Sequence, residues 1–99
     1  METGPRISPD VLARYAADAA YGVPGVRGVV GSGLPRRGGV RVADDGGRLA
    51  LEVHLSVDWG AAIPSVAREV QHRIADYLAT TTDARPVSVD VVVDQIGPR

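Results

Sequence analysis

The stretch "DWGAAIPSVAREVQHRI" (residues 58–74) decides the fold, because the hydrophobic pattern changes its period within it. Before it, apolar and polar side chains alternate from Arg48 to Trp59, as in a strand with one buried face. After Gly60 the apolar residues recur every three to four positions, as in a helix, and Pro64 suits a first helical turn. The helical stripe consists of Ile63, Val66, Ala67, Val70, Ile74 and Leu78. The stretch therefore predicts a strand, a sharp turn at Gly60 and a helix.

The strand predicted over residues 48–59 has two different faces. Its apolar face carries Leu49, Leu51, Val53, Leu55, Val57 and Trp59, and its other face carries Ala50, Glu52, His54, Ser56 and Asp58. We expect the apolar face to be buried, with Trp59 packed at the end of the core, and the second face to meet water.

One more helix and three more strands surround this unit. Ser8 is suited to cap a helix that starts at Pro9 and ends before Gly22. The remaining segments predict two short strands, "VPGVRGVV" (23–30) and "VRV" (40–42), a hairpin turn "DDGG" (44–47), and a closing strand "VSVDVVVD" (87–94) with Val87, Val89, Val91 and Val93 on one face.

The predicted order is α-β-β-β-α-β. Two amphipathic helices and one sheet with a single apolar face can bury each other, which predicts an α+β fold. We expect a two-layer sandwich with two helices packed on one face of a small mixed sheet. Neither an internal repeat nor a long linker divides the chain, so residues 1–99 should form a single domain.

The composition excludes several classes of function. Without cysteine the chain has no disulfide, thiolate metal site or cysteine nucleophile, and its two histidines cannot form a structural zinc site alone. A net charge of −1 argues against a general nucleic-acid binder. All basic side chains are arginines, which suit carboxylate and phosphate contacts but also follow from codon bias. We find neither a signal-peptide core nor a membrane-spanning run, and therefore expect a cytoplasmic protein.

Polar residues on the outer face of the sheet are the candidates for acid–base or metal chemistry: Glu52, His54, Asp58, Asp90 and Asp94. Polar side chains on a solvent face need no such role, and Ser56 beside His54 does not by itself make a catalytic triad. His72 and Asp76 on the second helix are expected to be a solvated pair. We therefore predict no catalytic residues, no cofactor and no metal.

Two glycine-containing patterns are candidate ligand-binding motifs. A phosphate cradle at the turn is disfavoured, because Gly60 is its only glycine and Pro64 removes a main-chain N–H. "GVPG" (22–25) and "GVRG" (25–28) match the GxxG clamp of KH RNA-binding modules, and "PRRGG" (35–39) adds a basic spot. That clamp lies between two helices, whereas both matches here run towards a strand. RNA binding remains the alternative function.

The closing strand breaks its alternation once, at Val92. This valine falls on the polar face, between Asp90 and Asp94. A lone exposed valine is common, but the edge of a small sheet can also pair with another chain. We predict a partner-binding surface at Val92, Asp90 and Asp94, used for weak self-association or for docking of another protein.

An aromatic-glycine pair is followed by an Ile-Pro-x-Val-Ala helix with a central glutamine: Trp59, Gly60, Ile63, Pro64, Val66, Ala67 and Gln71. This motif resembles the hallmark of the alkaline-shock-protein family of bacterial envelope stress-response proteins. "ISPDVLARYAADAAYGVPGV" (7–26) resembles the first helix of the family, and "VSVDVVV" (87–93) resembles its last strand. Thr82-Asp83 departs from the usual Thr-Gly, and the charged tails common in the family are absent.

The resemblance implies a small cytoplasmic α+β domain that supports cell-envelope homeostasis. It also implies a position near the membrane through partner proteins, such as a small membrane-anchor protein, and no established catalytic residues. The leading hypothesis is therefore a non-enzymatic protein-interaction module without direct membrane insertion.

Overall fold

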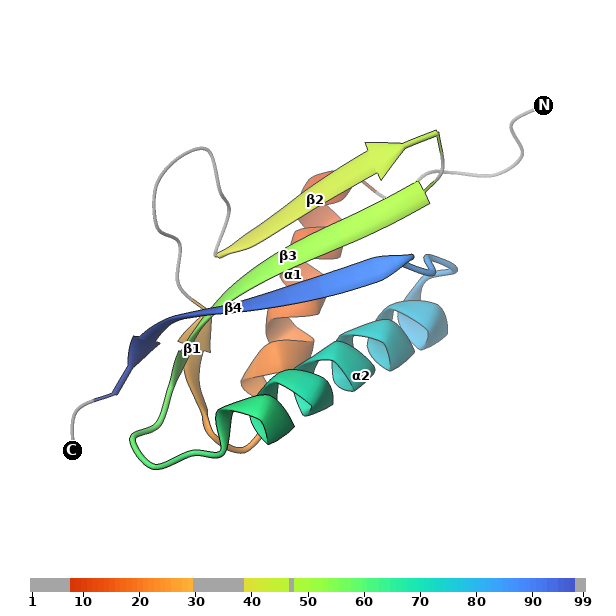
Figure 1. Ribbon diagram of the computed structural model, residues 1–99. Helices are drawn as coiled ribbons and strands as arrows, with labels where there is room; N and C mark the ends of the chain where they lie inside the picture. Colours follow the sequence, from red (N-terminus) through yellow and green to blue (C-terminus); the bar gives the residue numbers. More distant parts are fainter. Residues whose placement is uncertain (1–7, 30–38, 47, 98–99) are drawn as a thin grey trace.

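The computed structural model describes residues 8–29, 39–46 and 48–97 and confirms the predicted order of elements. Figure 1 shows α1 (Pro9–Tyr21), β1 (Val26–Val29), β2 (Val40–Asp45), β3 (Arg48–Val57), α2 (Ile63–Thr81) and β4 (Ser88–Ile96). Both helices lie on one face of the sheet, which makes a two-layer α+β sandwich as expected.

Strand β3 is the centre of the sheet. Its first half, Arg48 to Val53, pairs antiparallel with β2, and its last residues, Leu55 to Val57, pair antiparallel with β1. Strand β4 runs parallel to β3 over almost the same length, so it must occupy the opposite edge of β3. The sheet is therefore mixed, and β4 pairs only with β3 within the described residues.

The core lies between the sheet and the helices. The alternating apolar positions of β3 from Leu49 to Val57 are at most 7% exposed. The helices add Leu12, Ala13, Ala16 and Ala20 from α1, and Val66, Val70, Ile74 and Leu78 from α2. Helix α1 packs against β1, β2 and α2, whereas α2 also packs against β4. The apolar stripe of the sequence is thus the buried face of α2.

The helix ends follow from local chemistry. The Ser8 hydroxyl accepts a hydrogen bond from the Val11 N–H at 3.2 Å, which caps α1 as predicted. Helix α2 has Pro64 in its first turn and ends at Thr82. The Thr82 hydroxyl donates to the Leu78 carbonyl at 2.7 Å and accepts from the Ala84 N–H at 2.9 Å. Thr82 thus caps the C-terminal end of α2.

The turn after β3 confirms one expectation and corrects another. Gly60 has φ of +86°, a backbone conformation that favours glycine, so the sharp turn is confirmed. Trp59, however, is 57% exposed and does not pack at the end of the core. The reason is that β3 ends at Val57, so the alternation of the strand no longer sets the direction of the next side chains. Val87 is exposed for the same reason, since β4 starts only at Ser88.

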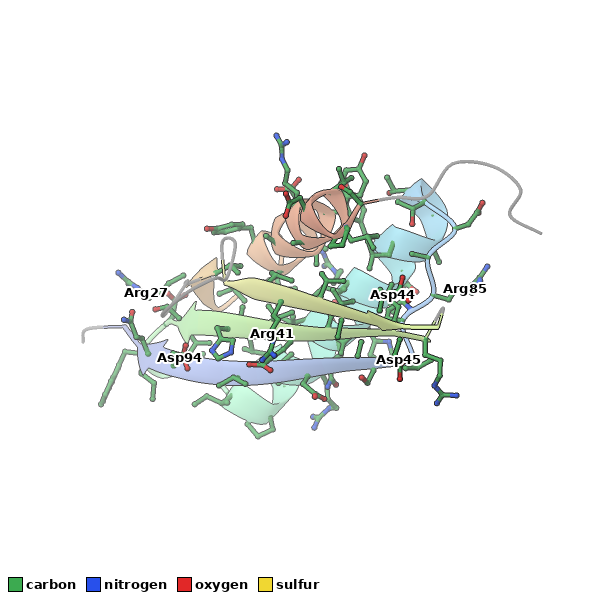
Figure 2. The ribbon with its side chains drawn as sticks, turned by 90° about the horizontal axis from the view of Figure 1, so that it is seen from above. Arg27, Arg41, Asp44, Asp45, Arg85 and Asp94 are labelled. Atoms are coloured by element: carbon green, nitrogen blue, oxygen red, sulfur yellow. The ribbon has the colours of Figure 1, made fainter. Side chains whose placement is uncertain are left out.

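Charged side chains gather at both ends of the sheet and across its uncovered face. Figure 2 shows Asp44, Asp45 and Arg85 at one end and Arg27 and Asp94 at the other. Arg41 extends from β2 between these ends, over the face that the helices leave open.

Candidate functional site

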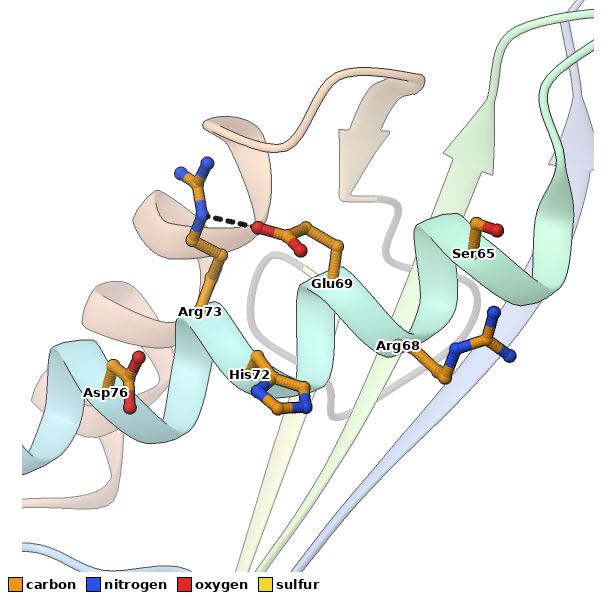
Figure 3. A pocket seen from close by; sticks show the side chains of 6 residues that line it. All are labelled: Ser65, Arg68, Glu69, His72, Arg73 and Asp76. Atoms are coloured by element: carbon orange, nitrogen blue, oxygen red, sulfur yellow. Dashed lines mark hydrogen bonds and ion pairs between the residues drawn. The ribbon is translucent and has the colours of Figure 1, made fainter.

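A shallow polar hollow of about 430 Å³ runs along the solvent side of α2 (Figure 3). All its lining residues belong to this one helix: Ser65, Arg68, Glu69, His72, Arg73 and Asp76. Arg73 Nε donates to Glu69 Oε2 at 2.9 Å, an i,i+4 pair on the helix surface. His72 and Asp76 are exposed, as expected, and no hydrogen bond or ion pair joins them in the described part of the chain. Balanced charges on a solvated helix do not define a ligand site.

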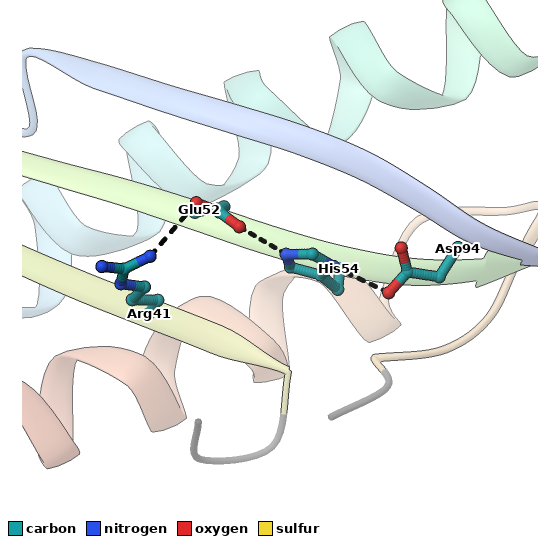
Figure 4. A network of polar contacts seen from close by, with 4 residues as sticks. All are labelled: Arg41, Glu52, His54 and Asp94. Atoms are coloured by element: carbon teal, nitrogen blue, oxygen red, sulfur yellow. Dashed lines mark hydrogen bonds and ion pairs between the residues drawn. The ribbon is translucent and has the colours of Figure 1, made fainter. Parts of the chain in front are cut away.

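The open face of the sheet carries a chain of four ionisable side chains in contact with one another (Figure 4). Arg41 on β2 lies 3.9 Å from Glu52 on β3. Glu52 Oε2 is 2.5 Å from His54 Nε2, and His54 Nδ1 is 2.7 Å from Asp94 Oδ2 on β4. We call Arg41, Glu52, His54 and Asp94 the open-face network. It crosses three strands and joins both edges of the sheet to β3.

Burial within this network is uneven. The side chain of His54 is 10% exposed, compared with 25% for Asp94, 34% for Glu52 and 67% for Arg41. The sequence predicted that His54 and Ser56 face water, and this is wrong, because both residues are buried. His54 lies between the stretch of β3 that pairs with β2 and the stretch that pairs with β1. The main-chain N–H of His54 donates to the Gly39 carbonyl at 2.9 Å. The carboxylates of Glu52 and Asp94 flank its ring.

The geometry favours the doubly protonated ring of His54. Ionised carboxylates only accept hydrogen bonds, and imidazole donates from both nitrogens only as the imidazolium. A neutral ring would direct a nitrogen lone pair at one of the two carboxylates. With Arg41 included, the network alternates positive and negative charge and is neutral overall, which offsets the cost of burying the charged ring.

The same contacts bear on catalysis. Each ring nitrogen of His54 already faces a carboxylate, so neither is directed at Ser56. A serine nucleophile needs a histidine nitrogen within hydrogen-bond reach as its base. The structure therefore brings Glu52, His54 and Asp94 together as predicted, but in an arrangement that does not form a serine triad.

The remaining acidic candidates lie outside the network. Asp58 follows β3 and lies 3.9 Å from Arg27. Asp90 is aligned with Glu52 in the register of β3 and β4 and is exposed, and its side chain makes no hydrogen bond or ion pair within the described residues. In the described part of the chain, no group of three or more histidine or acidic residues is placed to hold a metal ion.

The predicted partner-binding residues share the open face of β4. Val92 is 37% exposed and follows Asp90 along the strand. Asp94 is the extra residue of a β-bulge, because Leu55 pairs with Val93 and the next residue, Ser56, pairs with Gln95. Its carboxylate is bonded to His54. All three residues are thus exposed, and Asp94 also contacts His54.

The sequence did not predict the contact of Gln71. This side chain reaches from α2 and donates to the Val89 carbonyl of β4 at 2.8 Å. A polar residue next to the apolar stripe of a helix was the available signal, but the stripe alone does not reveal its acceptor. The contact ties the helical layer to the edge strand.

The GxxG patterns have structural explanations. Gly22 to Gly25 lie between α1 and β1, and Gly25 to Gly28 run into β1, so neither pattern joins two helices. Gly25 has φ of +98°, and a Cβ atom there would come within 2.9 Å of Val66 on α2. The basic residues of the "PRRGG" segment lie outside the described residues.

Comparison with solved structures supports the fold. The chain superimposes on a MamM CTD variant with a TM-score of 0.62 at 20% identity, covering 92% of this chain and 100% of that chain. A cadmium form of MamM CTD gives a TM-score of 0.60 at 22% identity, with 89% and 98% covered. A manganese form gives 0.57 at 22% identity, with 86% and 95% covered. At this level of identity the likeness concerns the fold.

The sequence itself defines the family. Residues 2–98 match the model of the alkaline-shock-protein family, ASP23, which is described by a cell envelope-related function. The chain belongs to this family, as the resemblance indicated. No curated protein matches the chain. Neither described helix is long and apolar enough to cross a bilayer.

Proposed function

We propose that this protein is a non-enzymatic interaction module that supports cell-envelope homeostasis by binding a protein partner through β4. The observation that carries the proposal is Val92, an exposed valine on the open face of an edge strand, beside the exposed carboxylate of Asp90. The cell envelope-related function of the family supports the setting. In this proposal the protein acts in the envelope stress response on the cytoplasmic side. It reaches the membrane through its partner, such as a small membrane-anchor protein.

Edge strands bind proteins by accepting a further strand. Unpaired main-chain groups on the outer edge supply hydrogen bonds, and alternate side chains supply specificity. On β4 the open-face side chains are Asp90 and Val92, so a suitable partner presents an extended segment with an apolar side chain against Val92 and a basic one near Asp90.

A second copy of the chain fits this edge less well. Antiparallel pairing of two β4 strands about Val92 would place Asp90 of each copy opposite Asp94 of the other. Like charges directly opposite each other destabilise a strand pair. We therefore expect self-association to be weak and a basic partner segment to bind more tightly.

Two other functions have less support. If His54 were the general base of an enzyme it would need a free ring nitrogen, and both of its nitrogens are engaged by carboxylates. A KH-type RNA clamp would need its GxxG loop between two helices, and here the loop leads from α1 into β1. Binding of single-stranded RNA at physiological salt would revive the RNA alternative.

The test compares two valines of equal exposure. Val92→Asp alters the open face of β4, and Val11→Asp alters α1, where Val11 is also 37% exposed. Both variants should remain folded by circular dichroism. In quantitative pull-downs from the native cell, proteins captured by the wild type and by Val11→Asp should be lost from Val92→Asp. Light scattering over a concentration series measures any self-association in the same three proteins. Equal capture and equal mass for all three would overturn the proposal.

A further inference from the structure

The bulged end of β4 is attached to β3 through an ionisable side chain. Asp94 is skipped in the register between β3 and β4, and its carboxylate contacts His54 Nδ1 at 2.7 Å. The following residues resume pairing, with Gln95 opposite Ser56 and the Gly97 N–H bonded to the Val57 carbonyl at 2.6 Å. The contact between His54 and Asp94 thus lies where the ladder of the two strands is interrupted.

We propose that Glu52, His54 and Asp94 form a proton-dependent clamp that holds the end of β4 on β3. With both nitrogens protonated, the ring donates to Glu52 on its own strand and to Asp94 on β4. After loss of one proton the ring can donate to only one carboxylate, and its other nitrogen presents a lone pair to the second. This removes one of the two bonds, and in the tautomer that keeps its proton on Nε2 the lone pair of Nδ1 faces Asp94 at the bulge and repels it.

The surrounding charges set the direction of the pH dependence. Glu52 from β3 and Asp94 from β4 contact the ring and favour its charged form, while Arg41 from β2 lies beside Glu52 and moderates that effect. Asp90 lies on the same face of β4, and Arg27 of β1 pairs with Asp58 beyond the end of β3. The clamp therefore holds while the ring of folded His54 carries both protons, and it is lost as pH rises through the point where the ring gives one up.

The clamp acts on the strand assigned above to partner binding. Its consequence for a partner rests on the proposed function: binding through β4 should weaken when the clamp opens as pH rises. The clamp itself needs no partner, so it can be tested even where the proposed function fails.

The chain offers a matched internal control, because its only other histidine, His72, is exposed on α2. In ¹⁵N-labelled protein, long-range NMR correlations report the protonation of each histidine ring. The series runs from about pH 5 to pH 10, which spans the ordinary histidine pKa of about 6.5. His54 should keep both ring protons to a higher pH in the wild type than in Asp94→Asn, because the variant removes one of the two carboxylates that favour the charged ring.

Amide hydrogen exchange gives a second readout. Protection factors at residues 95–97 should fall about tenfold across the His54 transition, relative to those at residues 50–53. His72→Gln should keep this pH dependence, and His54→Gln should lose it. If His54→Gln does not fold, hydrogen exchange of the wild type across the pH series and the ring titration of Asp94→Asn still test the clamp. A His54 ring that loses its proton at the same pH in the wild type and in Asp94→Asn, or relative protection at residues 95–97 that is constant across the transition, overturns the clamp.

Discussion

Gln71 of α2 donates a hydrogen bond of 2.8 Å to the main-chain carbonyl of Val89, which joins the helical layer directly to edge strand β4. Together with the His54–Asp94 contact, it holds β4 at both ends. The middle of the strand, where Val92 is exposed, lies between these two attachments. The proposed binding surface is thus built on a strand that side chains fix in place.

Gln71→Ala should destabilise the fold by about 0.5–1.5 kcal/mol, because the Val89 carbonyl loses a partner. Gln95→Ala is the matched control, since Gln95 is an exposed glutamine of β4 whose side chain makes no hydrogen bond in the described part of the chain. Urea unfolding measures both free energies. Equal losses would mean that the contact of Gln71 contributes nothing specific.

Gly25→Ala should cost about 1–3 kcal/mol, because it combines a positive φ with a contact of 2.9 Å to Val66. Gly46→Ala tests the backbone effect alone, since Gly46 has φ of +62° and open space around it. We expect the Gly25 variant to unfold at lower urea. A smaller loss at Gly25 than at Gly46 would show that packing against Val66 is not close.

The stripe of α2 gives a third prediction. Val70 is fully buried, so Val70→Ala should cost about 1–3 kcal/mol through lost burial and a cavity. Arg68 is exposed on the same helix, and Arg68→Ala should change the unfolding free energy by less than about 0.5 kcal/mol. Equal losses of unfolding free energy in the two variants, measured by urea unfolding, would contradict the assignment of the buried face of α2.

The sequence predicted the elements because each is encoded locally. The change of period at Gly60, the cap at Ser8 and the alternation in β3 each involve neighbouring residues. The open-face network could be predicted only as a set of residues on one face. His54 and Asp94 are 40 positions apart, and their contact depends on the parallel pairing of β4 and on a bulge that alternation does not reveal. Trp59 was misplaced because the pattern does not mark where β3 leaves the sheet.

Divalent metals should not bind tightly, although similar folds have been solved in manganese and cadmium forms. Each nitrogen of His54 faces a different carboxylate, so these groups do not converge on one point where an ion could lie. Isothermal titration calorimetry with zinc and manganese should give no sub-micromolar binding. Tight binding of either ion that is lost in His54→Gln would contradict this arrangement of the network.

The most direct test of binding through β4 is photo-crosslinking in the native cell. A photoreactive residue is placed at Val92 in one strain and at Val11, of equal exposure on α1, in another. Partner binding through β4 predicts discrete crosslinked protein species from position 92 that are absent or much weaker from position 11. Crosslinks from position 11 alone, or the same species at the same yield from both positions, would contradict the assignment of β4 as the binding surface.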